Sequence, residues 1–134
     1  MKNILVTGGA GYIGSVISYY LLKKNLKVFV IDNLSRGHRR LINKGAYFFK
    51  LSLDNKKKIR KIVIQNNIDT VFHLAAYIRV DESIKKPSLY FKNNVKGTAS
   101  LIESVKNTSV KRLIFSSSSA VYGKTKKKIN ELNK

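Results

Sequence analysis

Three glycines at a regular spacing constrain the fold of this 134-residue chain more than any other feature. Gly8 and Gly11 lie between a short apolar run at residues 4–6 and a segment, residues 12–24, whose apolar residues recur at helical spacing, and Gly14 lies near the start of that segment. The apolar run is typical of a buried parallel strand. A glycine turn between such a strand and a helix lets the backbone approach a phosphate, and the helix N-terminus offers it free N–H groups and a positive dipole. The pattern therefore predicts a pyrophosphate site.

An acidic residue supports a dinucleotide as the ligand. Asp32 follows the second predicted strand, residues 27–31, and comes 24 residues after Gly8. A carboxylate there accepts hydrogen bonds from the ribose hydroxyls of the adenosine half and repels a 2′-phosphate, which favours NAD over NADP. Arg36 weighs against that preference, because a nearby arginine accommodates a 2′-phosphate. The alternative role for Asp32 is that of a turn residue before Asn33.

The rest of the chain continues the alternation of strand and helix. Strands are predicted at residues 46–51, 69–74 and 111–115, and helices at residues 56–65 and from residue 87 to about residue 105. The predicted apolar stripe of the first helix consists of Ile13, Val16, Ile17, Tyr20 and Leu21. That of the last helix consists of Leu89, Phe91, Val95, Leu101, Ile102 and Val105. Right-handed crossovers then give a Rossmann-type, doubly wound α/β fold with helices on both faces, strand order 3-2-1-4-5, and one domain over residues 1–134.

Composition excludes several other classes of site. The chain has no cysteine, so disulfides, thiolate metal sites and cysteine nucleophiles are ruled out. Its two histidines, His38 and His73, are too few for a metal cluster, and no metal is expected. The apolar N-terminal run is too short for a signal peptide or a membrane span, so we expect a soluble cytoplasmic protein.

The charge raises an alternative function. Lysine and arginine total 27 against 7 aspartates and glutamates, for a formal net charge of +20. A basic nucleic-acid binder is one interpretation. The denser clusters, at residues 36–40, 56–61 and 124–128, are not interleaved with aromatic residues and accompany no zinc or RNA-binding motif. We favour a solvated basic surface that attracts polyanions without specificity and has no specific nucleic-acid partner.

Six segments carry a more specific pattern than the glycine loop alone. They read ILVTGGAGYIGS (4–15), IDNL (31–34), IDTVFHLAA (68–76), ESIKKP (82–87), YFKNNVKGT (90–98) and FSSSSAVYG (115–123). In order and spacing they resemble the N-terminal half of the UDP-glucose 4-epimerases, sugar-nucleotide members of the extended short-chain dehydrogenase family. The resemblance covers essentially the whole chain.

The resemblance implies a set of residues that hold NAD. They are Gly8, Gly11, Tyr12, Ile13 and Gly14 at the pyrophosphate; Asp32, Asn33, Leu34, Ser35, Arg36 and Gly37 around the adenosine ribose; Ser52 and Leu53 near the adenine; Leu74, Ala75, Ala76 and Tyr77 after the fourth strand; and Asn94, facing the dinucleotide from its helix. Ser52 stands where the family has an aspartate that hydrogen-bonds adenine. Asp81 and Ile78 replace a usual glycine and a position that is often basic.

The resemblance also implies a reaction. A family tyrosine takes the proton of the sugar 4-hydroxyl while hydride moves to NAD, and the 4-keto intermediate turns over before hydride returns, which interconverts UDP-glucose and UDP-galactose. Ser118 would be the catalytic serine that hydrogen-bonds the 4-oxygen. The alternative is that the four serines from Ser116 onward satisfy backbone groups at a strand end. Related dehydratases carry Thr-Asp-Glu where this chain has residues 118–120, which favours epimerisation.

The family's Tyr-x-x-x-Lys base pair is missing from the expected place, since the chain stops at Lys134. Local matches are Tyr19 with Lys23, Tyr20 with Lys24, and Tyr122 with Lys126. The first two pairs lie on a helix face, and Tyr122 belongs to a Val-Tyr-Gly motif that does not supply the base. We therefore expect a truncated chain with an incomplete sheet and an unprotected fifth strand, inactive alone and weak in binding NAD.

The full-length family would take a UDP-hexose substrate and form a homodimer, without a membrane partner. Two alternatives to an epimerase fragment stay open. One is a non-catalytic NAD-binding module, and the other is one half of a split nucleotide-sugar epimerase or dehydratase.

Overall fold

The computed structural model describes residues 2–122 and 129–130. In that part of the chain, five parallel strands form one sheet in the order β3-β2-β1-β4-β5, as predicted. The strands are β1 Asn3–Thr7, β2 Lys27–Asp32, β3 Tyr47–Lys50, β4 Thr70–His73 and β5 Arg112–Phe115. Because all five run the same way, their carboxyl ends share one edge of the sheet, where ligands of open α/β sheets bind.

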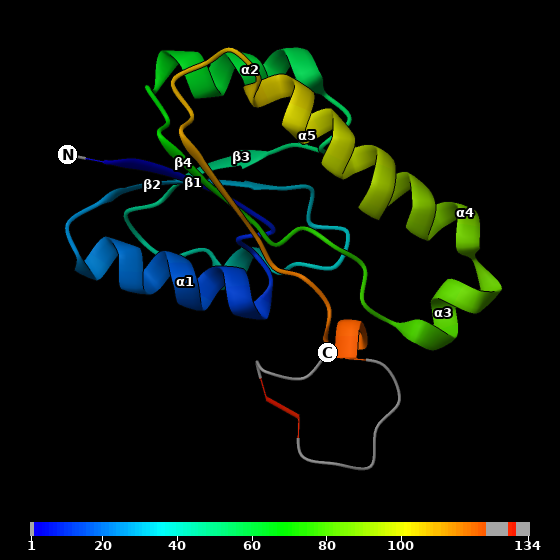
Figure 1. The fold of residues 1–134 in the computed structure, drawn as a ribbon. Helices are drawn as coiled ribbons and strands as arrows, with labels where there is room; N and C mark the ends of the chain where they lie inside the picture. The colour runs from blue at the N-terminus through cyan, green and yellow to red at the C-terminus, as the bar shows by residue number, and fades with distance from the viewer. Residues whose placement is uncertain (1, 123–128, 131–134) are drawn as a thin grey trace.

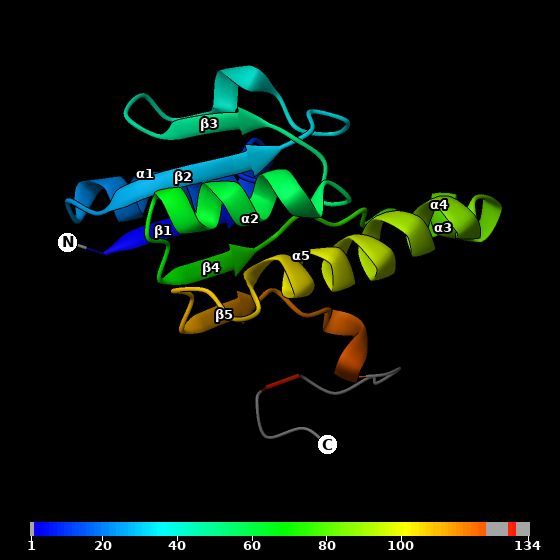
Figure 2. The ribbon, with the colours of Figure 1, turned by 90° about the horizontal axis from the view of Figure 1, so that it is seen from above.

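Helices cover both faces of the sheet, which confirms the doubly wound α/β class. Helix α1 (Tyr12–Lys23) lies on one face, and α2 (Lys56–Gln65) and α5 (Gly97–Val105) lie side by side on the other (Figure 1). Two short helices, α3 (Val80–Lys85) and α4 (Pro87–Tyr90), extend beyond the carboxyl ends of the strands (Figure 2). Helices α3 and α4 therefore lie beyond the same edge of the sheet as the glycine loop.

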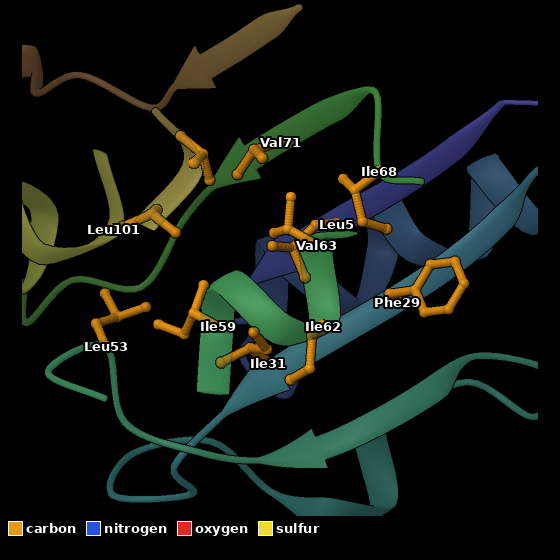
Figure 3. Close-up of a cluster of buried hydrophobic side chains, with 11 residues drawn as sticks. Leu5, Phe29, Ile31, Leu53, Ile59, Ile62, Val63, Ile68, Val71 and Leu101 are labelled. Atoms are coloured by element: carbon orange, nitrogen blue, oxygen red, sulfur yellow. The ribbon is translucent and has the colours of Figure 1, made fainter. Parts of the chain in front are cut away.

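The main core lies between the sheet and the α2–α5 layer. Figure 3 shows Leu5, Ile31 and Val71 of the strands opposite Ile59 and Val63 of α2, all of them buried. On the opposite face, a smaller cluster consists of Ile4, Val6, Val28 and Val30. Successive residues of β1 and β2 are buried because both faces of a doubly wound sheet are covered. This burial explains why the strands read as continuous apolar runs.

Helix α1 has fully buried residues that lie outside the predicted apolar stripe. Its buried residues are Gly14 and Ser18, whereas Val16 and Tyr20 of the expected apolar stripe are exposed. Small residues let the helix axis approach the loop and sheet closely, and the Ser18 hydroxyl is satisfied by donating to the Gly14 carbonyl at 2.8 Å. The prediction of a helix was right, and Leu21 of the predicted stripe packs against the cluster on this face of the sheet, but the fully buried positions are Gly14 and Ser18.

Where one helix was predicted from residue 87, the structure has three consecutive helical segments. A π-helical turn, Phe91–Lys96 (η2), separates α4 from α5, and α3 precedes them without having been predicted. Leu101 and Val105 are buried as expected, but Phe91, Val95 and Ile102 are exposed. Single π turns inside helices occur frequently at functional sites. Here the turn carries Asn94, one of the predicted cofactor residues.

Two further short 3₁₀ turns, η1 (Arg39–Leu41) and η3 (Ser119–Tyr122), follow β2 and β5. Strand β5 lies at one edge of the sheet, with β3 at the other, and all four residues of β5 are exposed. Among the described residues, β5 pairs only with β4. In the described part of the chain, no helix has both the length and the apolar character needed to cross a bilayer.

Candidate dinucleotide site

The glycine loop is fastened to strands on both sides. Gly8 has φ +75°, a conformation that favours glycine, and a Cβ there would lie 2.8 Å from the backbone nitrogen of Ala75. The Gly8 N–H donates to the carbonyl of Ile31 at 2.8 Å, and the Gly11 N–H donates to the carbonyl of Gly8 at 3.1 Å. The loop is therefore a rigid turn between the ends of β1, β2 and β4.

Close packing of the loop leaves no room for side chains at its inner positions. A Cβ on Gly14 would overlap the carbonyl oxygen of Gly8, so Gly14 lets α1 approach the turn. The glycine that lies against the sheet is Gly9, whose Cβ would come within 2.6 Å of Val30 Cγ1. Gly9 thus brings the turn close to β2, and Gly14 brings α1 close to the turn.

The N-terminus of α1 faces outward from this turn. The N-cap residue is Gly11, which has no side chain to cap the helix, and the exposed Tyr12 and Ile13 begin the first turn. The first N–H groups of a helix lack partners within the helix. They can therefore donate to an anion, and the helix dipole favours that charge.

The carboxylate of Asp32 connects the glycine loop to the loop after β2. Its Oδ2 accepts from the Ala10 N–H at 3.0 Å, and its Oδ1 accepts from the Leu34 N–H at 2.8 Å. The second bond closes a turn in which Leu34 has φ +60°, so the alternative role as a turn residue is present. A carboxylate has about four acceptor positions, so these two bonds leave capacity for ribose hydroxyls.

The loop after β2 folds back over the glycine loop. A Cβ on Gly37 would lie 2.8 Å from Ala10 Cβ, and the His38 N–H donates to the Ala10 carbonyl at 2.9 Å. Asn33 donates from Nδ2 to Ser52 Oγ at 3.2 Å, which brings two predicted residues together beside Asp32. Leu53 differs, because its side chain is buried in the main core.

Asn94 is hydrogen-bonded to the backbone of the segment that follows β4. Its Oδ1 accepts from the Tyr77 N–H and its Nδ2 donates to the Tyr77 carbonyl, both at 2.9 Å. This side chain therefore fixes the backbone of the segment 74–77 that follows β4. The part of Asn94 in holding the dinucleotide stays a prediction, and its side chain is bonded to the segment that borders the site.

A buried histidine supports the same edge, and the sequence offered no signal for it. Thr98 donates from Oγ1 to the Asn94 carbonyl at 2.6 Å, so its oxygen accepts from His73 Nε2 at 2.8 Å. The other ring nitrogen, Nδ1, then accepts from the Thr7 hydroxyl at 2.7 Å. Burial lowers the pKa of His73, which keeps the ring in this neutral tautomer. The chain of bonds joins β1, β4 and α5.

A second polar group joins the loop after β2 to the helices beyond β4. Arg36 donates from Nη2 to both carboxylate oxygens of Glu82, at 2.7 and 2.6 Å, and its guanidinium lies 5.0 Å from the ring centroid of Tyr77. Tyr90 donates its hydroxyl proton to Glu82 at 2.9 Å, and Tyr77 donates to Ser35 at 3.1 Å. The Arg36 hydrogen bond holds the pKa of Glu82 below its usual range, and Glu82 raises the pKa of Arg36.

Ser118 lies at the carboxyl edge, between β5 and η3, and is exposed. Its carbonyl accepts from the Val121 N–H at 3.2 Å. Of the Tyr-x-x-x-Lys matches, Tyr122 is described but Lys126 lies outside the described residues, as does the basic cluster at residues 124–128. Tyr19 and Lys23 form a cation–π contact on α1, with Nζ 4.7 Å from the ring centroid.

The described residues contain no group of three or more histidines, aspartates and glutamates placed to hold a metal ion. The carboxyl edge thus brings together a glycine turn, a helix N-terminus and the carboxylate of Asp32. Comparison with known proteins assigns this arrangement to a family. Residues 4–134 match the model of the NAD dependent epimerase/dehydratase family. The chain belongs to this family.

Its relatives are UDP-glucose 4-epimerases. The enzyme of Lactobacillus helveticus is 44% identical over 93% of this chain, and the protein of that name from Klebsiella pneumoniae is 38% identical over 90% of this chain and 92% of its own length. The solved structure of the Thermus thermophilus enzyme in complex with NAD matches with a TM-score of 0.90 and 36% identity, over 98% of this chain and 43% of that one. This chain spans 38% of the length of the Lactobacillus relative.

Proposed function

We propose that this chain binds NAD at the carboxyl edge of its sheet, as the cofactor-binding part of a UDP-hexose 4-epimerase. The observation that carries the proposal is the position of Asp32, whose carboxylate is bonded to Ala10 of the glycine loop and to Leu34 of the next loop. One anionic group thus borders both the pyrophosphate position and the ribose position. The proposal treats residues 1–134 as one NAD-binding Rossmann unit.

The residues at this edge fit a dinucleotide. The turn from Gly8 to Gly14 is a cradle that a Cβ would fill, and it ends at the uncapped N-terminus of α1. In the proposed complex, those N–H groups bind the pyrophosphate and the remaining acceptor positions of Asp32 bind the adenosine ribose. Asn33 and Ser52 border the adenine, and the segment 74–77 borders the remainder of the cofactor. When bound, NAD accepts a hydride from the sugar and returns it.

The proposed substrate is a UDP-hexose, because the relatives carry the name UDP-glucose 4-epimerase. In this proposal Ser118 orients the sugar 4-oxygen by a hydrogen bond as that oxygen loses and regains its proton. Its position after β5 supports the role, because it shares the carboxyl edge with the glycine loop. Asn94 and His73 act indirectly, by fixing the backbone on which the cofactor rests.

Calorimetric titration of the whole chain tests the proposal. We expect NAD and ADP-ribose to bind with dissociation constants within about tenfold of each other, because the groups that recognise the dinucleotide contact its adenosine and pyrophosphate half. UDP-glucose titrated alone serves as the comparison and should bind more weakly than NAD. Binding of UDP-glucose without any binding of NAD or ADP-ribose would contradict the proposal.

A further inference from the structure

The ion pair between Arg36 and Glu82 joins two parts of the site that lie 46 residues apart in sequence. Arg36 lies in the loop that leaves Asp32, four residues after the proposed ribose-binding carboxylate. Glu82 lies on α3, beyond the carboxyl end of β4. The pair therefore spans the adenosine corner of the proposed cofactor site.

Several contacts direct the Arg36 side chain toward Glu82. The Glu82 side chain is 15% exposed, accepts from Arg36 with both oxygens, and accepts a third bond from the hydroxyl of Tyr90. Tyr77 lies under the guanidinium, and its ring also contacts Tyr90 edge-on with centroids 5.6 Å apart. These contacts come from the segments after β2 and β4 and from α3 and α4, so the pair is part of a packed cluster.

The chemistry of this corner decides between two cofactors. An arginine in the loop after the second strand is the group that binds the 2′-phosphate of NADP, whereas an acid at the strand end binds the free ribose hydroxyls of NAD. This chain has both groups, Arg36 and Asp32. With Glu82 bound to Arg36, a 2′-phosphate would meet the carboxylates of Asp32 and Glu82 and would have to compete for the guanidinium.

We infer that Glu82 is a specificity-determining residue, which keeps the site selective for NAD over NADP by engaging Arg36. The inference rests on the proposed function, since it requires that the site bind a dinucleotide. Glu82 acts through Arg36 and is a positioning residue, because no contact between Glu82 and the cofactor is needed.

Calorimetric titration of the whole chain with NAD and with NADP tests the inference. Glu82→Gln removes the negative charge but keeps the size of the side chain and an acceptor for Tyr90. We expect this variant to gain about tenfold in affinity for NADP relative to NAD, because a charge-assisted bond from Arg36 to the 2′-phosphate becomes available. The matched control is Asp81→Asn, which removes the same charge one residue away, where the partner is Arg79. The control should leave the NADP-to-NAD ratio within about twofold of the original.

A second variant keeps the test independent of how Glu82→Gln folds. Arg36→Gln in the otherwise unchanged chain removes the guanidinium and leaves the Glu82 carboxylate unpaired, so it should not raise the affinity for NADP relative to NAD. Combined with Glu82→Gln, it should abolish the gain. An unchanged cofactor ratio in Glu82→Gln, or a raised NADP-to-NAD affinity ratio in Arg36→Gln alone, would overturn the inference while NAD binding by the unchanged chain still supports the proposed function. If the unchanged chain binds neither cofactor, both are overturned.

Discussion

Asp32 is the residue on which most of the proposed site depends. Its carboxylate accepts one backbone N–H from the glycine loop and one from the loop after β2. Because the two loops carry no other acidic side chain, one substitution affects both of them. This one buried side chain therefore stabilises both loops and, in the proposed site, also binds the ligand.

Asp32→Asn is expected to destabilise the fold around the two loops and to weaken the binding of NAD. An asparagine has one acceptor oxygen, so whichever way the amide turns, one of the two backbone N–H groups loses its partner. The free energy of unfolding should fall by about 1–3 kcal/mol, and NAD affinity by about tenfold or more. Urea unfolding and calorimetry measure the two effects. The exposed Asp54→Asn is the control, and equal behaviour of the two variants would show that Asp32 has no special role.

His73 gives the stability of the fold a defined pH dependence. Burial lowers its pKa in the folded chain, so the unfolded chain binds more protons in the window between the two pKa values. The pKa of histidine in the unfolded chain is about 6.5, and above that pH the stability contributed by the neutral ring is present in full. This stability is lost as the pH falls from about 6.5 through the pKa of His73 in the folded chain.

Replacement of His73 should remove this dependence. We expect His73→Gln to be less stable than the unchanged chain near pH 7.5, with a difference that shrinks on the way to about pH 5.5. Urea unfolding at a series of pH values measures it. The exposed His38→Gln should retain the original slope. A stability difference between His73→Gln and the unchanged chain that is constant over this range would contradict the assignment.

At the scale of elements, Gly8, Gly9 and Gly14 near the turn between β1 and α1 leave no space for a Cβ, whereas Gly97 does. A Cβ on Gly14 would overlap the Gly8 carbonyl, but a Cβ on Gly97, in α5, would make ordinary contacts at 3.5 Å with Leu53. The two positions thus differ in space although both are helical glycines. Comparing alanine substitutions at Gly14 and Gly97 therefore distinguishes the effect of close packing at the glycine loop from the general effect of helix propensity.

Gly14→Ala should lower the free energy of unfolding by about 1–3 kcal/mol, because helix and turn must move apart. Gly97→Ala should leave it unchanged or raise it by up to about 1 kcal/mol, because alanine is the better helix former. Chemical unfolding of both variants measures the difference. Equal destabilisation by the two substitutions would mean that Gly14 is not tightly packed.

The elements that the sequence predicted well are those with a local signal. The five strands and their order follow from apolar runs and from the rules for parallel crossovers. The fully buried positions of α1 could not be predicted in this way, because Gly14 and Ser18 give no apolar signal. The π turn at Phe91–Lys96 was missed for a similar reason, since its apolar spacing looks like that of an ordinary helix.

Within the candidate site, too, the residues with a local sequence signal were predicted and the contacts between distant residues were not. The glycine positions and Asp32 were read directly from the sequence. The clamp between Asn94 and Tyr77, the bonds of His73 and the Arg36–Glu82 pair join residues 17 or more positions apart, and only the folded chain brings them together. Polar residues of this kind look like ordinary surface residues in a single sequence.

At the scale of the whole molecule, the net charge of +20 means that most of the 27 basic side chains have no acidic residue to pair with. Among the described residues the ion pairs are Arg36–Glu82, Lys56–Glu103 and Arg79–Asp81. Repulsion among the remaining cations opposes the compact state, and salt screens it. We expect added sodium chloride to raise the melting temperature of the chain.

The same charge should give weak, nonspecific binding to polyanions. Retention of the chain on immobilised DNA is expected at low salt and should disappear by about 0.5 M sodium chloride, because binding depends on counterion release. Column elution in a salt gradient, with NAD titrated in parallel, measures this. Retention that persists at high salt, in a chain without affinity for NAD, would favour a nucleic-acid function instead.

The central claim is that a dinucleotide binds where the glycine loop and Asp32 meet. The most direct test is a titration of the ¹⁵N-labelled chain with NAD, followed by the amide resonances of each residue. Saturable shifts are predicted for the amides of residues 8–14 and 32–37, with little change at the amides of α2 on the far side of the main core. Absence of saturable shifts, or shifts confined to residues outside the carboxyl edge, would contradict the claim.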